Sequence, residues 1–322
     1  IGVRPDSHLA ADCGLSCGRN GAILVDDQMR TSDGDIYALG DAVQIVNFVT
    51  GQPGYVALAG PANKQGRIAA DHICGIPSAF HGTQGSAVWK LFDMSIAVTG
   101  LNETAAKAAG LDYDKVYTFS PSHATYYPGA SNMSIKLLFE KATGRILGGQ
   151  LVGFDGVDKR CDVLAAAVRS HLTVSDLTEL ELCYAPPFSS AKDPVNMAGF
   201  VAENVMAGLV RQYFWQDVAA LTERTDITLL DVRTKGEYAG GHIRNAINIP
   251  LDSLREHLDE LDKSKPLYVN CHSGLRSYLA CRILTQNGFD CHNLAGGYRL
   301  YESATRDIPF DGAPKHPCGI NV

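Results

Sequence analysis

The run from Cys271 to Ser277 constrains the fold of this 322-residue chain more than any other feature. The apolar stretch 266–270 before it predicts a buried strand, and residues 277–284 predict an amphipathic helix. Cys271 is therefore expected where a strand turns into the N-terminus of a helix. Backbone N–H groups and the helix dipole attract an anion there, so they favour the thiolate over the thiol.

This loop predicts a site for covalent catalysis on a thiolate. Arg276 lies five positions after Cys271 and is expected to help close the loop over a negative sulfur. The residues between them are predicted to contact the substrate or the bound sulfur: His272, Ser273, Gly274 and Leu275. A buried structural cysteine is the alternative, and the strand-to-helix position argues against it.

Motifs on both sides of this loop resemble those of the rhodanese family. They are LLDVR at 229–233, GHI at 241–243, CxxGxR at 271–276 and a Gly-Gly turn at 296–297. The resemblance implies a persulfide on Cys271, whereas related phosphatases have a loop that is one residue longer. The four residues between Cys271 and Arg276 therefore favour sulfur over phosphate, and a phosphatase stays as an alternative. Asp231 and Arg233 are expected to pair and brace the domain.

Composition excludes several other classes of protein. A formal net charge of −7 argues against nucleic acid as a partner, because phosphate binding needs a basic surface. No apolar run reaches the roughly 18 residues of a membrane span. The nine cysteines are odd in number and scattered, which favours a reducing cytoplasm. Cys13 and Cys17 lack a second Cys/His pair, so no metal site is predicted.

Residues 36–39 predict a short strand that ends in Gly40-Asp41. Gly40 lets a ligand approach the backbone, and Asp41 can accept a hydrogen bond from a sugar or ribityl hydroxyl. An ordinary turn is the alternative, since Gly-Asp is common in turns. The pattern TxxxxIYALGD at 31–41 resembles the second flavin-contact motif of FAD-dependent pyridine nucleotide–disulfide oxidoreductases.

That resemblance implies that Asp41 binds the ribityl chain of the flavin. It also implies that the helix within 54–70 points its N-terminus, near Ala57 and Leu58, at the isoalloxazine ring. The superfamily has GxGxxG fingerprints and a redox-active cysteine in its N-terminal region, and neither occurs in this sequence. We therefore expect the C-terminal part of a longer enzyme, cut within its flavin domain, without the NAD(P)H site.

Strands followed by helices predict an α+β domain in the middle of the chain. Residues 133–140 and 146–152 alternate in polarity and are expected to pair, and helices are expected at 159–171, 174–180 and 195–210. This region resembles the dimerisation domain of the same oxidoreductases. Strand 133–140 and helix 195–210 are expected to supply the apolar surface of a two-fold homodimer.

Two tyrosines stand in loops beside Pro and Gly. The segments HAxYYPGA at 123–130 and YAPPFSSAKDP at 184–194 resemble coenzyme A-disulfide reductases, some of which carry a rhodanese domain. The resemblance implies that Tyr126 and Tyr184 reach the partner subunit's active site and assist the sulfur chemistry. It also implies that Lys64 and Lys192 lie near bound coenzyme A. Tyrosines that only pack and lysines that are merely solvated are the alternatives.

The sequence thus predicts the end of an FAD-binding domain at 1–84, an α+β dimerisation domain at 85–210 and an α/β rhodanese domain with a parallel sheet at 211–322. The predicted function is part of an NAD(P)H-dependent flavoprotein that reduces coenzyme A-disulfide, CoA-persulfide or polysulfide. Thiosulfate is a further expected sulfur donor. Flavin retention by this chain alone is left open. The alternative is a non-enzymatic dimerisation and sulfur-carrier docking module, against which the intact Cys271 and Arg276 argue.

Overall fold

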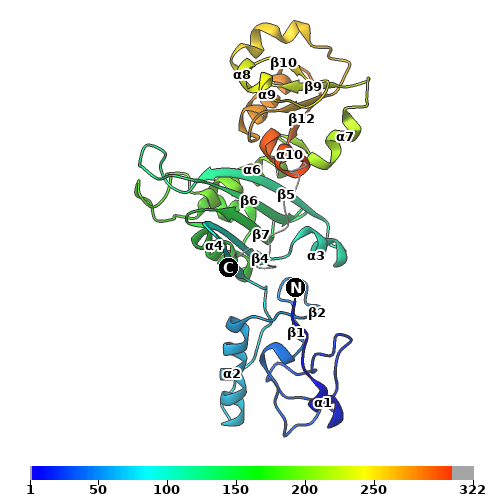
Figure 1. Cartoon of the computed structure of the whole chain (residues 1–322), viewed down its shortest axis with the longest axis vertical. Coiled ribbons are helices and arrows are strands. Elements are labelled where there is room, and N and C mark those ends of the chain that lie inside the picture. Colours follow the sequence, from blue (N-terminus) through cyan, green and yellow to red (C-terminus); the bar gives the residue numbers. More distant parts are fainter. Residues whose placement is uncertain (1, 307–322) are drawn as a thin grey trace, which may run out of the picture. The chain divides into compact units, whose positions relative to one another are not determined.

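The computed structural model describes residues 2–306, which fall into two compact units divided between Met206 and Ala207 (Figure 1). The predicted end of the rhodanese domain at residue 322 lies outside the described residues. No helix in the described range is long and apolar enough to cross a bilayer. Nor do residues 2–306 gather His, Cys, Asp and Glu into a group able to hold a metal ion.

The first unit begins with a segment of short elements. These are α1 (His8–Asp12), the 3₁₀ helix η1 (Gly40–Ala42), the antiparallel pair β1 (Ile45–Val46) and β2 (Pro53–Gly54), and α2 (Ala59–Ile73). The predicted strand at 36–39 is wrong, because only an isolated bridge joins Tyr37 to Arg30. Ile36 and Leu39 are 39% and 40% exposed, so their side chains are not packed like those of a buried strand.

An antiparallel five-stranded sheet forms the centre of this unit, in the order β3-β4-β7-β6-β5. The strands are β3 (Ala87–Leu91), β4 (Met94–Gly100), β5 (Tyr113–Pro121), β6 (Asn132–Glu140) and β7 (Ile146–Gly153). The helices are α3 (Glu103–Ala108), α4 (Val157–Arg169), α5 (Val174–Glu179) and α6 (Pro194–Met206). The predicted pairing of 133–140 with 146–152 is confirmed, since Ile135 lies opposite Leu151.

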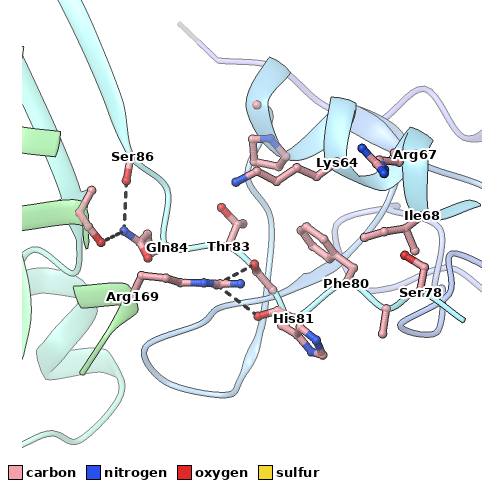
Figure 2. Close-up of a pocket in the computed structure, with 15 residues that line it drawn as sticks. Lys64, Arg67, Ile68, Ser78, Phe80, His81, Thr83, Gln84, Ser86 and Arg169 are labelled. Carbon is pink, nitrogen blue, oxygen red and sulfur yellow. Dashed lines mark hydrogen bonds between the residues drawn. The ribbon is translucent and has the colours of Figure 1, made fainter. Parts of the chain in front are cut away.

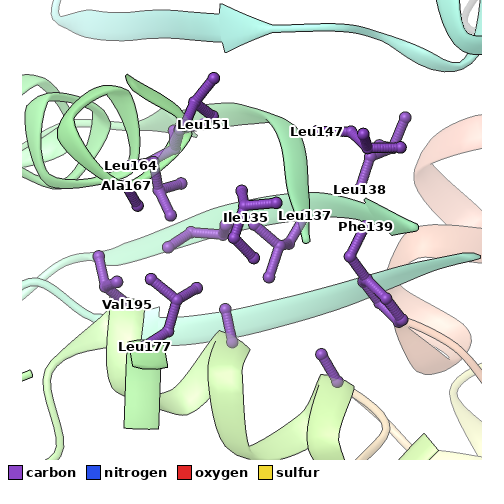
Figure 3. Packing of buried hydrophobic residues seen from close by; sticks show 14 of the residues in the cluster. Ile135, Leu137, Leu138, Phe139, Leu147, Leu151, Leu164, Ala167, Leu177 and Val195 are labelled. Carbon is purple, nitrogen blue, oxygen red and sulfur yellow. The ribbon is translucent and has the colours of Figure 1, made fainter. Parts of the chain in front are cut away.

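The core of this unit lies between the sheet and its helices. Figure 3 shows side chains from α4, α5 and α6 gathered around Ile135 and Leu137 of β6, which are 1% and 0% exposed. Burial of one such side chain contributes about 2 kcal/mol. The expected dimer surface on 133–140 is therefore wrong, because its apolar face is already covered within the chain.

Helix α6 ends at Met206, before the predicted end at residue 210. Gly208 follows with a left-handed φ of 66°, a backbone conformation that ends helices.

The second unit contains a five-stranded sheet in the order β10-β9-β11-β12-β8, and every pair of neighbours is parallel, as predicted. The strands are β8 (Arg211–Tyr213), β9 (Thr228–Asp231), β10 (Ile247–Asn248), β11 (Leu267–Asn270) and β12 (Cys291–Leu294). The helices are η2 (Trp215–Asp217), α7 (Val218–Leu221), α8 (Lys235–Ala239), η3 (Leu251–Glu260), α9 (Leu275–Gln286) and α10 (Gly297–Thr305). Because β11 is central, the residue after it lies at the carboxyl edge of the sheet, where ligands bind in such folds.

Candidate functional site

Cys271 follows the central strand β11 directly and precedes α9 by four residues, as the sequence predicts. The residue is 1% exposed. Its Sγ accepts hydrogen bonds from the Gly274 backbone N–H and the Ser277 hydroxyl, both at 3.2 Å. Gly274 can turn its N–H toward the sulfur because it adopts a left-handed φ of 102°. The loop therefore surrounds one sulfur atom with donors that stabilise negative charge.

The Gly-Gly turn at 296–297 supports the loop from behind. The backbone N–H groups of Tyr298 and Arg299 donate to the carbonyl oxygens of Cys271 (2.7 Å) and His272 (2.9 Å). A Cβ atom on Gly297 would lie 2.7 Å from the Cys271 oxygen and from the His272 carbonyl group. The second glycine of the motif thus permits a close backbone approach that fixes the shape of the loop.

Among the described residues, no hydrogen bond joins Arg276 to the Cys271 sulfur. Its guanidinium instead donates to both carboxylate oxygens of Glu237 in α8, at 2.8 and 2.6 Å. These hydrogen bonds lower the pKa of Glu237 to about 2 and raise the pKa of Arg276. Glu237 also closes the capping box of α8 with Thr234. Arg276 therefore anchors the start of α9 to α8.

The other predicted contact residues surround the same loop. His272 is exposed, and its pKa is lowered by partial removal from water and by the charge of Arg299. Leu275 is 58% exposed, and Ser273 is half-buried. The imidazole of His272 and the side chain of Leu275 thus lie on the solvent side of the loop, where a substrate approaches.

Asp231 and Arg233 form the predicted pair. Their side chains are 0% and 4% exposed, and the Arg233 Nη2 lies 2.7 Å from the Asp231 Oδ2. Arg233 also donates to the Gly241 carbonyl at 2.7 Å and lies 4.1 Å from the ring centre of Tyr298. The pair therefore holds the end of β9 against α10, the helix that follows the Gly-Gly turn.

The structure brings the two predicted tyrosines together in the first unit. Tyr126 Oη and Tyr184 Oη are 3.1 Å apart, and this hydrogen bond raises the pKa of Tyr184. Tyr126 is 75% exposed and Tyr184 49% exposed. Two phenols from different loops therefore present a hydrogen-bonded pair of hydroxyl groups to solvent. A role in packing alone would not require this hydrogen bond.

Arg160 of α4 holds both tyrosine loops in place, a role that the sequence did not indicate. It is 1% exposed and forms an ion pair with Asp193 at 3.0 Å. It also donates to the Ser122 carbonyl at 2.9 Å, before Tyr126, and to the Ser189 hydroxyl at 3.1 Å, after Tyr184. An arginine in an amphipathic helix usually faces water, so its sequence context gives no signal of this burial.

The expected flavin-contact residues lie around the start of α2. The Gly40 N–H donates to Oε1 of Gln65, which is 1% exposed, and Gly40 has a left-handed φ of 72°. Leu58 is extended and its side chain does not cap the helix. Ala57 precedes it and is half-buried, and Asp41 is exposed. An uncapped 15-residue helix beside a glycine turn fits an electron-rich group such as a flavin.

Lys64 lines a cavity of about 580 Å³ between α2, the segment 78–86 and α4 (Figure 2). Arg67 and Arg169 also line it, and its lining residues include neither Asp nor Glu. Arg169 donates to the Gly82 carbonyl at 3.3 Å and lies 4.1 Å from the ring centre of Phe48, so it braces the wall. Lys192 is exposed but does not line this cavity.

One unit holds a cysteine loop on a parallel sheet and the other an antiparallel sheet with paired loop tyrosines, which fits the two resemblances found in the sequence. Comparison with known families agrees. Residues 214–304 match the rhodanese-like domain, residues 86–194 the pyridine nucleotide-disulphide oxidoreductase dimerisation domain, and residues 1–66 the pyridine nucleotide-disulphide oxidoreductase family. The chain thus combines segments similar to the pyridine nucleotide-disulphide oxidoreductases with a segment similar to the rhodanese-like domain.

Individual proteins show the same relationship. Coenzyme A disulfide reductase of Staphylococcus aureus is 36% identical over 204 residues, which cover 63% of this chain and 46% of that protein. The crystal structure of reduced Bacillus anthracis CoADR-RHD matches with a TM-score of 0.91 and 46% identity, over 94% of this chain and 54% of that one. A NAD-dependent persulfide reductase from A. fulgidus matches with a TM-score of 0.85 and 42% identity, over 93% and 54%. The chain thus spans about half the length of the relatives it matches.

Proposed function

We propose that this protein reduces coenzyme A-disulfide, CoA-persulfide or polysulfide with NAD(P)H electrons, and that its rhodanese-like domain carries sulfane sulfur on Cys271. The observation that carries the proposal is the environment of the Cys271 Sγ, which accepts hydrogen bonds from Gly274 and Ser277 at 3.2 Å. The same donors suit the terminal sulfur of a persulfide, because a persulfide sulfur is an anion at neutral pH.

With thiosulfate as donor, the Cys271 thiolate attacks the outer sulfur. The S–S bond of thiosulfate breaks, sulfite leaves with the bonding electron pair, and Cys271–S–S⁻ forms without any change in total charge. Leu275, which is 58% exposed, and the exposed His272 leave room for the leaving group on the solvent side. A thiol such as coenzyme A can then take the terminal sulfur by the same kind of attack.

The tyrosine pair supports a homodimer. Tyr126 and Tyr184 expose their hydroxyl groups instead of burying them, and Phe188 in the same loop is 69% exposed. Such side chains are suited to entering the active site of a second copy, where a phenol can donate a proton to a leaving thiolate. The match to the dimerisation domain at 86–194 supports this assembly.

In this proposal, coenzyme A and the flavin bind next to α2. The cationic cavity at Lys64 and Arg67 suits the phosphates of coenzyme A, and the exposed Lys192 is a further point charge for them. Gly40, Asp41, Ala57 and Leu58 would hold FAD, which when bound supplies electron transfer from NAD(P)H to sulfur.

Incubation of the protein with thiosulfate tests the proposal. Intact mass should rise by one sulfur atom, and cyanide should remove that atom as thiocyanate. Cys271→Ser should abolish the gain, because a hydroxyl does not form a persulfide. Cys161→Ser is the matched control, since Cys161 is also buried but lies in α4 of the other unit. Undiminished sulfur loading of Cys271→Ser would disprove the assignment.

A further inference from the structure

Two more cysteines lie behind the Cys271 loop, and the proposed function does not use them. Cys281 is 2% exposed and belongs to α9, and Cys291 is 3% exposed and begins β12. Cys291 Sγ lies 3.3 Å from the Cys281 carbonyl oxygen and 3.1 Å from the Thr285 hydroxyl oxygen. One turn of α9 separates Cys281 from Thr285, so both face the same sulfur atom.

We propose that Cys281 and Cys291 are a redox-active dithiol, which a small uncharged oxidant such as hydrogen peroxide converts into a reversible disulfide. The site is distinct from Cys271 and takes a hydroperoxide as its substrate class. Its burial admits a molecule the size of water more readily than a bulky charged disulfide. The bond would join α9 to β12 directly behind the loop that holds Cys271.

The structure places the two cysteines against each other in one buried cluster. A disulfide needs Cα atoms less than about 7 Å apart and side chains that point toward one another. The contact of Cys291 with the Cys281 carbonyl brings the side chain of one cysteine onto the backbone of the other. The nearby Cys281 side chain also lowers the pKa of Cys291, to about 7.

The chemistry divides the roles of the two cysteines. The Cys291 thiolate, stabilised by Cys281 and Thr285, attacks one peroxide oxygen, breaks the O–O bond and becomes a sulfenic acid as hydroxide leaves. The Cys281 sulfur then attacks the Cys291 sulfur and expels the hydroxyl, which leaves as water with the Cys281 proton. In total, two thiols and one hydrogen peroxide give one disulfide and two waters.

Peptide mapping of the full chain tests the proposal, because trypsin places Cys271, Cys281 and Cys291 in three different peptides. Cleavage after Arg276, Arg282 and Arg299 places Cys281 in 277–282 and Cys291 in 283–299, and Cys271 stays in a third peptide. After brief treatment with hydrogen peroxide, peptides 277–282 and 283–299 should appear linked, with the loss of two hydrogens, and dithiothreitol should separate them.

Cys161 provides an internal control in the same sample. It is 4% exposed, and burial raises its pKa to about 11, so it should stay a free thiol. In Cys281→Ser, the Cys291 sulfenic acid has no thiol to attack it and should be trapped by dimedone. The proposal is overturned if Cys281 and Cys291 remain free thiols when Cys271 is fully oxidised, or if either links to Cys271 instead.

Discussion

Tyr126 and Tyr184 join their hydroxyl groups by a hydrogen bond of 3.1 Å although 58 residues separate them in the chain. Neither ring is buried, so the bond does not result from close packing of the rings. Each phenol instead fixes the orientation of the other at the surface. Such preorganisation benefits a group that must meet a substrate or a partner in one orientation.

Tyr126→Phe and Tyr184→Phe each remove one hydroxyl and keep the ring. If the pair donates or orients a proton, the rate of NAD(P)H-dependent CoA-disulfide reduction should fall by roughly 10²-fold in either variant. The melting temperature should not change, because the ring carries most of the packing. Tyr127→Phe is the matched control, as it alters a neighbouring half-exposed tyrosine in the same loop. Rates within a few-fold of the wild-type value in both variants would assign the pair to packing.

Arg160→Met should destabilise the first unit by about 3–5 kcal/mol, because it leaves the carboxylate of Asp193 buried without its partner. The further change Asp193→Asn in the same chain should restore part of that loss, since it removes the uncompensated charge. Urea unfolding followed by circular dichroism measures both values. A loss below about 1 kcal/mol would mean that the pair contributes little to holding the loops.

The sequence was most informative where one short segment determines the structure. The Cys271 loop was predictable because the strand, the turn and the helix are consecutive, and the parallel sheet follows from strands that alternate with helices. The partner of Arg276 was not predictable, because Glu237 lies 39 residues away in α8 and only the folded sheet brings the two together. Arg160 was missed for the same reason, since its partners come from two distant loops.

Apolar patterning also left one question open. It correctly indicated that residues 133–140 bury one face, but a pattern does not say whether the covering surface comes from the same chain or from a second copy. The structure covers that face with its own helices. At 36–39 the pattern indicated a strand, yet a strand needs a neighbour along its length, and Tyr37 has a single bridge to Arg30.

Gly297→Ala should disrupt the Cys271 loop, because the new Cβ would lie 2.7 Å from the carbonyl oxygen of Cys271. The expected cost is about 3 kcal/mol, from the left-handed backbone and the collision together. Gly288→Ala separates the two effects. Gly288 also has a left-handed φ, at 83°, but its Cβ would meet nothing within 4 Å. Thiosulfate sulfurtransfer should be lost in the first variant and kept in the second, and equal activities would show that the turn does not shape the loop.

Glu237→Gln tests the anchor of Arg276 through its pH dependence. Gln can keep the capping box of α8, and it removes the charge together with one of the two oxygens that accept from Arg276. The pKa of Glu237 is lowered to about 2 in the folded protein, so the ion pair stabilises the fold fully above the unfolded value of about 4.3. That contribution is lost as the pH falls from there toward 2. Both side chains are about a third exposed, so we expect about 1 kcal/mol at pH 7.

The measurement is the difference in unfolding free energy between wild type and Glu237→Gln at a series of pH values. The difference should be constant from pH 7 to about 5 and should shrink steadily below about 4.3, because protonation then neutralises the wild-type carboxylate as well. Glu256→Gln, at an exposed position of η3, is the matched control for the loss of one negative charge. A difference that stays the same down to pH 3 would show that the charge of Glu237 does not hold Arg276, and that the contact is one of shape alone.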